Sequence, residues 1–245
     1  MSDEGTGRRE RGLVVAVDGP SGSGKSSVSR EVARRLGLRY LDTGAMYRAV
    51  CWSVLACGLD TGAGEAAQDA VAAHTVALGL EISTDPDDAL VAVRHQDRWV
   101  EVTDEIREHR ISAAVSAVAT NLGVRAELRR RQRELIDAAR ADGRGMVAEG
   151  RDITTVVAPD ADVRLLLTAT EATRLARRAR EVHGEASAET VAALRDVVVR
   201  RDADDATVSS FHTAADGVLE LDSSGLTFEQ TVQAVLSVCG NVSVG

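Results

Sequence analysis

Residues 13–36 read LVVAVDGPSGSGKSSVSREVARRL, and this stretch decides the fold of the chain. An unbroken apolar run at 13–17 leads into a glycine-rich segment, after which apolar residues recur at helical spacing up to Leu36. This order predicts a buried strand, a loop and an amphipathic helix. The loop matches the pattern G-x-x-x-x-G-K-[ST] from Gly19 to Ser26, with the strand and helix that a phosphate-binding loop requires on either side.

The residue types of this loop suit a bound anion. Glycines allow successive backbone N–H groups to converge on a phosphate, and the N-terminus of the following helix points its positive dipole at the same place. Lys25 adds a mobile charge that can follow a transferring phosphoryl group, and the hydroxyl of Ser26 lies where the motif meets Mg²⁺. The alternative is a glycine-rich turn beside a solvated lysine, which does not account for the flanking strand and helix.

Composition narrows the class of protein. The chain has 245 residues, and 44% of them are hydrophobic, which is enough to form a hydrophobic core. Its net charge of -9 argues against non-specific nucleic-acid binding. Cys51, Cys57 and Cys239 form no C-x-x-C pair, so neither a disulfide framework nor a zinc site is indicated. We find no secretory signal and no apolar run of membrane-spanning length. We expect a cytoplasmic protein with a disordered tail at 1–11.

Two further predicted strands end in polar residues. The strand at 38–41 runs into DTGAMYR at 42–48, and the strand at 145–148 runs into EGRD at 149–152. Ligands in open α/β sheets bind beyond the carboxyl ends of the strands, so both turns should face the crevice of the phosphate loop. Arg48 and Arg151 can hold a second phosphate, and Asp152 can accept hydrogen bonds from a base or approach the metal. The alternative for the first turn is an ordinary helix start capped by Thr43, with Arg48 in solvent.

Residues 61–110 interrupt the alternation of strands and helices. Strand-like runs at 80–83, 89–93 and 98–102 predict a small antiparallel meander inserted into the parallel core. We interpret His95 and Trp99 as packing or surface residues. Helical periodicity returns at Ile111. The second helix of this region carries a cluster of five arginines, and we interpret most of them as part of a solvent-exposed helix face. They are Arg125, Arg129, Arg130, Arg131 and Arg133.

Residues 170–211 predict a pair of arginine-bearing helices. Arg174, Arg177 and Arg178 lie on a helix that begins near Thr170, and a second helix is expected at 188–201. The polar turn between them favours a mobile flap that closes arginines over a transferring phosphate. A surface hairpin whose arginines pair only with neighbouring carboxylates is equally compatible with the sequence.

Together with runs at 163–168 and 217–221, five core strands alternate with helices. The last strand is followed by a helix whose start fits a capping box at 227–230. Because crossovers between parallel strands are right-handed, this alternation predicts an α/β fold in which a five-stranded parallel sheet lies between two layers of helices.

The motifs GPSGSGKS, DTGAMYR, VRAELRRRQR, EGRDITTVVAPDA and RRDADD occur in the order in which bacterial cytidylate kinases carry them. The sequence therefore resembles that family, which belongs to the nucleoside monophosphate kinases and has the P-loop NTPase fold. The resemblance implies a core at 12–60, 129–172 and 212–245, an inserted NMP-binding domain at 61–128 with a small antiparallel sheet and helices, and a helical lid at 173–211.

The same resemblance implies transfer of the γ-phosphoryl group of MgATP to CMP or dCMP by a monomer with no nucleic-acid or membrane partner. It implies that Lys25, Arg151 and Arg177 are catalytic and that Ser26 meets the Mg²⁺. The implied ATP-binding residues are Gly19, Pro20, Ser21, Gly22, Ser23, Gly24, Lys25, Ser26 and Ser27. The implied acceptor-binding residues are Thr43, Tyr47, Arg48, Ser116, Arg125, Arg151, Asp152, Arg201 and Asp205.

The sequence departs from the family pattern at three places. Thr43 stands where many relatives have serine, which preserves the hydroxyl. Val208 stands where an arginine is common, and Ser209-Ser210-Phe211 lacks a proline-leucine pair. Because the last two departures lie in the predicted lid, they bear on how the lid closes more than on the phosphoryl transfer itself.

Two other functions share the phosphate loop. A small-acceptor kinase of the shikimate or gluconate type would need neither the inserted meander nor the pair of Ser116 and Arg125. A nucleotide-switch protein that binds GTP would carry an N-K-x-D motif, and the sequence has none.

Overall fold

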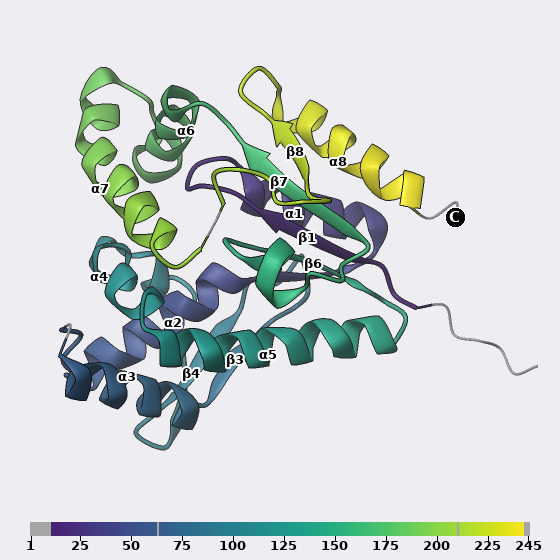
Figure 1. Ribbon diagram of the computed structural model, residues 1–245. Helices are drawn as coiled ribbons and strands as arrows, with labels where there is room; N and C mark the ends of the chain where they lie inside the picture. The colour runs from purple at the N-terminus through teal and green to yellow at the C-terminus, as the bar shows by residue number, and fades with distance from the viewer. Residues whose placement is uncertain (1–10, 63, 210, 243–245) are drawn as a thin grey trace, which may run out of the picture.

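The computed structural model describes residues 11–62, 64–209 and 211–242 (Figure 1). Eleven side chains of the two lid helices, at 181–183, 188, 193–194, 196–198 and 200–201, lie outside this description. The main sheet has five parallel strands in the order β2-β6-β1-β7-β8. They are β1 (Val14–Asp18), β2 (Arg39–Asp42), β6 (Met146–Gly150), β7 (Val163–Thr168) and β8 (Leu219–Asp222). The predicted five-stranded parallel sheet is confirmed.

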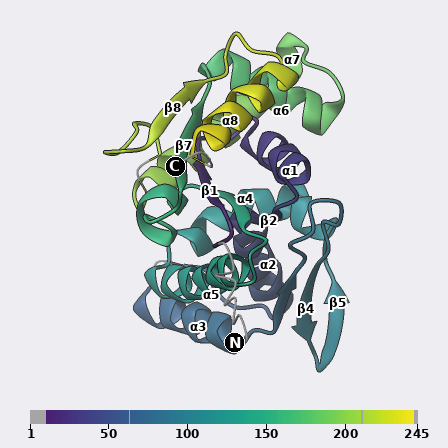
Figure 2. The ribbon, with the colours of Figure 1, turned by 90° about the vertical axis from the view of Figure 1, so that its right-hand side faces the viewer.

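Helices cover both faces of this sheet because β1 is apolar on both sides. Val14 and Ala16 face a cluster formed with α2 (Thr43–Ala56), α4 (His109–Ala119) and α5 (Leu122–Ala141). Val15 and Val17 face the opposite cluster, formed with α1 (Lys25–Leu36) and α8 (Phe228–Val242). Successive side chains of a strand point to opposite faces, so an unbroken apolar run requires a helix layer on each side. Figures 1 and 2 show α1 and α8 together on one side of the sheet and α2 and α5 on the other.

The insertion contains the predicted meander and one helix that the sequence did not predict. Strands β3 (Leu80–Ile82), β4 (Val91–His95) and β5 (Arg98–Glu101) form an antiparallel sheet, and Gln96 and Asp97 close its hairpin with φ of 47° and 62°. Helix α3 (Glu65–Ala77) precedes them and packs against α5 (Figure 1). Its sequence is rich in alanine, and only two of its side chains are buried, so it has no apolar stripe of the kind that predicts a helix.

The segment predicted to be a lid folds into two helices, α6 (Glu171–His183) and α7 (Ala188–Ala206), with Thr170 and Ser187 as their N-caps. We keep the name lid for these two helices and the residues up to 211. The predicted end of the second helix near residue 201 is wrong, because α7 continues through the RRDADD motif. Aspartate has a low intrinsic helix propensity, but Asp202 and Asp205 are three positions apart and share one helix face. Both reach Arg151 on the core, and this tertiary contact outweighs the local preference.

Between the small sheet and α4 lies the short helix η1 (Glu105–Arg107), and after β6 comes a single wide turn, η2 (Ile153–Val157). The predicted capping box of α8 is confirmed, since Thr227 and Gln230 each accept a hydrogen bond from the other's backbone N–H. Among the described residues, no helix combines the length and the apolar character needed to cross a membrane.

Two glycines with a positive φ differ in how closely other atoms surround them. Gly145 has a φ of 73°, and a Cβ there would collide with the backbone of Leu13, whereas Gly58 has a φ of 66° with open space around it. We expect Gly58→Ala to lower the free energy of unfolding by about 1 kcal/mol through backbone strain alone, and Gly145→Ala by about 3 kcal/mol. Urea denaturation followed by circular dichroism measures both. Equal losses of unfolding free energy in the two variants would show that the close contact between the Leu13 backbone and Gly145 adds nothing to the cost of the substitution.

Candidate active site

The phosphate loop connects β1 to α1 in a conformation that only glycine accepts at two positions. Gly22 and Gly24 have φ of 76° and 88°. A Cβ at Gly22 would lie 2.5 Å from the backbone carbonyl of Arg174, so the lid helix α6 lies directly against the loop. Below the loop, the buried Asp18 carboxylate accepts hydrogen bonds from the backbone N–H groups of Ile153 and Thr154, which fixes the turn after β6 to the end of β1.

Lys25 and Ser26 begin α1 and face the carboxylate of Glu149 at the end of the neighbouring strand β6. The Ser26 hydroxyl donates to Glu149 Oε1 at 2.7 Å, and Lys25 Nζ lies 3.9 Å from Oε2. Glu149 is only 2% exposed. Burial, reinforced by the charge of Asp42, raises the pKa of the Glu149 carboxyl, and Lys25 opposes that shift. Lys25 is also the only lysine in the chain.

Sequence reasoning did not select Glu149 as a site residue. The available signal was its position as the charged residue that ends the predicted apolar strand at 145–148, because ligands in such sheets bind beyond the carboxyl ends of the strands.

The turn after β2 is built around Asp42, which caps α2 by accepting a hydrogen bond from Ala45 N at 2.8 Å. The alternative in which Thr43 is the cap is therefore wrong; its hydroxyl donates instead to the backbone carbonyl of Glu149. Arg48 is not in solvent either, because its Nη2 lies 3.0 Å from Asp42 Oδ2. Burial works to raise the pKa of Asp42, but the charge of Arg48 and the Ala45 N–H outweigh it and hold that pKa below its usual value.

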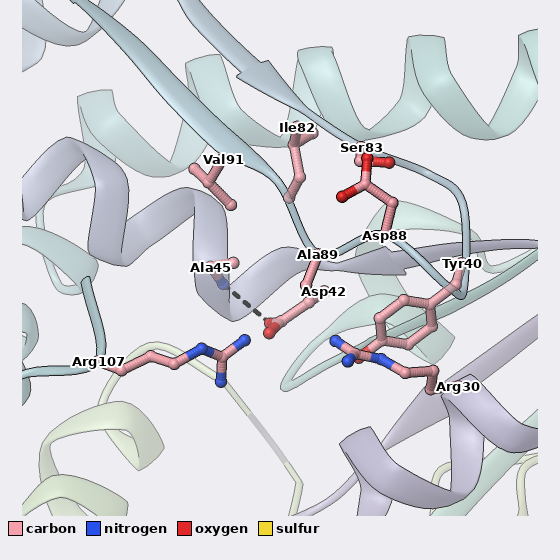
Figure 3. Close-up of a pocket in the computed structure, with 10 residues that line it drawn as sticks. All are labelled: Arg30, Tyr40, Asp42, Ala45, Ile82, Ser83, Asp88, Ala89, Val91 and Arg107. Atoms are coloured by element: carbon pink, nitrogen blue, oxygen red, sulfur yellow. Dashed lines mark hydrogen bonds between the residues drawn. The ribbon is translucent and has the colours of Figure 1, made fainter. Parts of the chain in front are cut away.

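Figure 3 shows the small pocket beside this turn. Arg107 of η1 extends toward the Asp42 carboxylate, and Arg30 of α1 lies over the ring of Tyr40, 5.0 Å from its centroid. Farther along α2, the hydroxyl of Tyr47 is buried and has no hydrogen-bond partner among the described residues. Burial raises the pKa of Tyr47 to about 12, so the hydroxyl stays protonated and can donate to a ligand.

A second polar group forms around Asp152. Its Oδ2 accepts hydrogen bonds from Arg125 Nη2 at 2.6 Å and from Arg129 Nη2 at 2.9 Å. Arg125 also donates to the Ser209 hydroxyl of the lid segment at 2.7 Å, and Ser116 lies half-buried on α4. The structure thus joins α5, the turn after β6 and the lid at one point.

The sequence predicts a solvent-exposed face for most of the five clustered arginines on α5. This prediction is correct for Arg130, which is exposed and pairs with Glu127 and Glu134. It is wrong for Arg131 and Arg133. Arg131 donates to three backbone carbonyls at the end of α3, and Arg133 pairs with Asp160. These two side chains fasten α5 to its neighbours, a role that depends on tertiary contacts the sequence does not display.

Three arginines reach the phosphate loop. Arg177 Nη1 donates to Ser23 O at 2.9 Å, Arg174 Nη1 to Ser21 O at 2.8 Å, and Arg151 Nη1 to Gly19 O at 3.3 Å. The surface-hairpin alternative is therefore wrong for the two lid arginines, although the exposed pair of Arg195 and Glu171 fits it. Sequence reasoning placed Arg174 on the helix without assigning it to the site.

The remaining predicted residues are placed as follows. The lid residue Asp205 lies 3.0 Å from Arg151 Nη2. Ser27 is exposed on the first turn of α1, and Pro20 is buried between β1 and the rest of the loop. The side chain of Arg201 lies outside the described residues.

A parallel sheet with a phosphate loop after its central strand, an insertion after the second strand and an arginine-bearing lid defines a P-loop kinase fold. The family model described as cytidylate kinase matches residues 15–241. A cytidylate kinase of Cutibacterium acnes is 48% identical over 92% of this chain and 95% of its own length. A cytidylate kinase of Rhodococcus opacus is 46% identical over 92% and 94%. The chain therefore belongs to the cytidylate kinase family, which confirms the resemblance seen in the sequence.

Two buried hydroxyls on α2 give a matched test of the site's geometry. The Thr43 hydroxyl donates a hydrogen bond to the protein and that of Tyr47 has no such partner. We expect Thr43→Val to lower the free energy of unfolding by about 1 to 2 kcal/mol, because it leaves a buried carbonyl without its donor. Tyr47→Phe should leave the free energy of unfolding unchanged or raise it slightly. A larger loss for Tyr47→Phe than for Thr43→Val, measured by denaturant titration without nucleotide, would contradict this assignment.

Proposed function

We propose that the protein transfers the γ-phosphoryl group of ATP to CMP or dCMP, producing ADP and CDP or dCDP. The observation that carries the proposal is the meeting of Arg151, Arg174 and Arg177 at the phosphate loop, with a second polar site next to it around Arg48 and Asp152. Such a crevice can bind two phosphate groups from two nucleotides. Membership of the cytidylate kinase family, with relatives that carry that name over nearly their whole length, supports CMP as the acceptor.

The donor nucleotide would bind to the loop at 19–27. Its backbone N–H groups hold the phosphates, Lys25 follows the transferring group, and Arg177 neutralises charge on the side of the loop that faces the lid. The reaction needs little covalent help from the protein, because the acceptor is already a phosphate anion and no strong base has to remove a proton. Positioning and charge neutralisation therefore supply the catalysis.

The oxygens at the start of α1 fit a magnesium ion. The Ser26 hydroxyl and the Glu149 carboxylate lie within hydrogen-bond distance of each other, and Mg²⁺ prefers such oxygen ligands. Burial disfavours the ionised form of Glu149, and a cation beside it would relieve that penalty. When bound, Mg²⁺ would neutralise charge on the transferring phosphates. We infer that Ser26 and Glu149 hold it, directly or through its waters.

The acceptor nucleotide would bind between the turn after β2 and the group around Asp152. Arg48 and Arg151 are proposed to hold its phosphate, since a guanidinium can bind phosphate oxygens in pairs. Ser116, Arg125 and Asp152 are proposed to contact the cytosine base, and Arg201 and Asp205 the rest of the nucleotide. The hydroxyls of Thr43 and Tyr47 complete the proposed acceptor site. That of Tyr47 has no partner among the described residues, whereas that of Thr43 would accept from the ligand while it still donates to the Glu149 carbonyl.

Closure of the lid over both nucleotides would exclude water, which would otherwise accept the phosphoryl group. We further infer a monomer in the cytoplasm. No disulfide joins Cys51, Cys57 and Cys239, all of which lie in the described part of the chain, and this supports a reducing compartment.

The first test is the choice of acceptor. ADP release from MgATP is measured with CMP, dCMP, UMP, AMP, GMP and shikimate as separate acceptors. We expect turnover with CMP and dCMP to exceed that with AMP, GMP and shikimate by at least about 100-fold, because only cytosine matches a site built around Arg125 and Asp152. Turnover concentrated on shikimate would identify the other kind of small-acceptor kinase. Heat protection by GTP but not by ATP would instead support a nucleotide switch.

The second test removes the charge of the phosphate loop. We expect Lys25→Met to lower turnover by at least about 100-fold, as loss of a preorganised charge does at transition states. Arg34→Met, at the exposed end of the same helix, is the control and should keep wild-type turnover. The melting temperature of both variants should stay near that of the wild type. Turnover of Lys25→Met within a few-fold of the wild type would contradict the proposed role.

A further inference from the structure

Asp202 lies at the phosphate loop, although the sequence analysis selected only its neighbours Arg201 and Asp205 as site residues. It lies near the end of α7 and is 4% exposed. Its Oδ1 accepts hydrogen bonds from Arg151 Nη2 at 2.9 Å and from the Ser21 backbone N–H at 3.2 Å, and its Oδ2 accepts one from Arg174 Nη1 at 2.5 Å. One carboxylate therefore joins the lid, the turn after β6 and the phosphate loop.

The two arginines that Asp202 holds come from different parts of the chain. Arg151 follows β6 and also stacks on the ring of Phe211, 4.3 Å from its centroid, while Arg174 belongs to the first turn of α6. Each guanidinium also donates to a carbonyl of the phosphate loop. Two guanidiniums this close to one loop repel each other, and a buried carboxylate between them removes that repulsion.

The hydrogen bonds to Asp202 leave one terminal nitrogen of each guanidinium able to bind a phosphate. Asp202 and Asp205 both pair with Nη2 of Arg151, so Nη1 remains turned toward the loop, where it donates to the Gly19 carbonyl. Arg174 uses Nη1 for both of its bonds, which leaves its Nη2 without a partner among the described residues. Both arginines can thus donate to a phosphate while Asp202 still fixes their direction.

We propose that Asp202 is a positioning residue for phosphoryl transfer, which sets Arg151 and Arg174 at the mouth of the phosphate loop when the lid is closed. This inference rests on the proposed kinase function. Burial works to raise the pKa of the Asp202 carboxyl, but the charges of Arg151 and Arg174 and the Ser21 N–H hold that pKa below its usual value. The carboxylate is therefore ionised at neutral pH and acts as a fixed negative charge between the two arginines.

The experiment compares Asp202→Asn with a matched control, Asp204→Asn, on the same helix. Asp204 is half-buried, and its carboxylate has no hydrogen bond or ion pair among the described residues. We expect Asp202→Asn to lower kcat with CMP and ATP by about 10- to 100-fold, since small misplacements of catalytic charges have effects of that size. The KM values for both nucleotides should change by less than about threefold, a split that loss of ground-state binding would not produce. Asp204→Asn should keep the wild-type kcat.

A double-mutant cycle shows whether Asp202 acts through Arg174. If it does, Asp202→Asn should lower kcat by a smaller factor in the Arg174→Met background than in the wild type, because one of the two arginines to be positioned is already absent. Multiplied effects of the two substitutions would overturn the proposal. So would a fall in kcat that is matched by a fall in the melting temperature, or an unchanged kcat for Asp202→Asn.

The same assay separates this inference from the proposed function. Wild-type protein that fails to phosphorylate CMP or dCMP overturns the proposed function. Active wild-type protein with an equally active Asp202→Asn variant overturns only the positioning role.

Discussion

Pairing between buried carboxylates and cations determines how the crevice is built. Carboxylates from three parts of the chain each face a basic side chain that the phosphates of a nucleotide would also attract. The pairs are Glu149 with Lys25, Asp42 with Arg48, Asp152 with Arg125, and Asp202 with Arg151 and Arg174. A lone buried charge would lose its hydration at a cost of several kcal/mol, whereas a paired and hydrogen-bonded charge is tolerated. The folded protein can therefore hold many positive groups in one crevice while its net charge is -9.

The parallel sheet brings these pairs together. All five strands end at the same edge, so residues more than a hundred positions apart become neighbours there. Ser26 meets Glu149 because β1 and β6 are adjacent, and Arg177 meets Ser223 because β8 ends beside the lid. The lid helices α6 and α7 lie beside this edge (Figure 1), and Arg174 and Arg177 reach the phosphate loop from them. A core that is apolar on both faces leaves this edge as the place where polar side chains from several strands can gather.

The sequence predicted the parts of the fold that have strong local signals. The phosphate loop and the five core strands carry apolar runs and a glycine pattern. The candidate site residue Lys25 belongs to that pattern, and the candidates Arg48 and Arg151 come shortly after the ends of predicted strands. Helix α3 was missed because its alanines give no stripe, and α7 was ended too early because its aspartates favour caps and turns over helix interiors. The partners of Glu149 and Asp202 could not be predicted, since they depend on which strands become neighbours and where the lid comes to rest.

Of the 29 lysine and arginine residues of the chain, all are arginines except the lysine of the phosphate loop. Arginine does not react with amine-selective reagents, and Lys25 is mostly shielded, with 15% of its side chain exposed. Amine-directed acylation or reductive methylation would therefore modify one side chain of this protein, besides a terminal α-amino group. A spectroscopic label on that side chain would report the state of the phosphate loop without interference from other side chains.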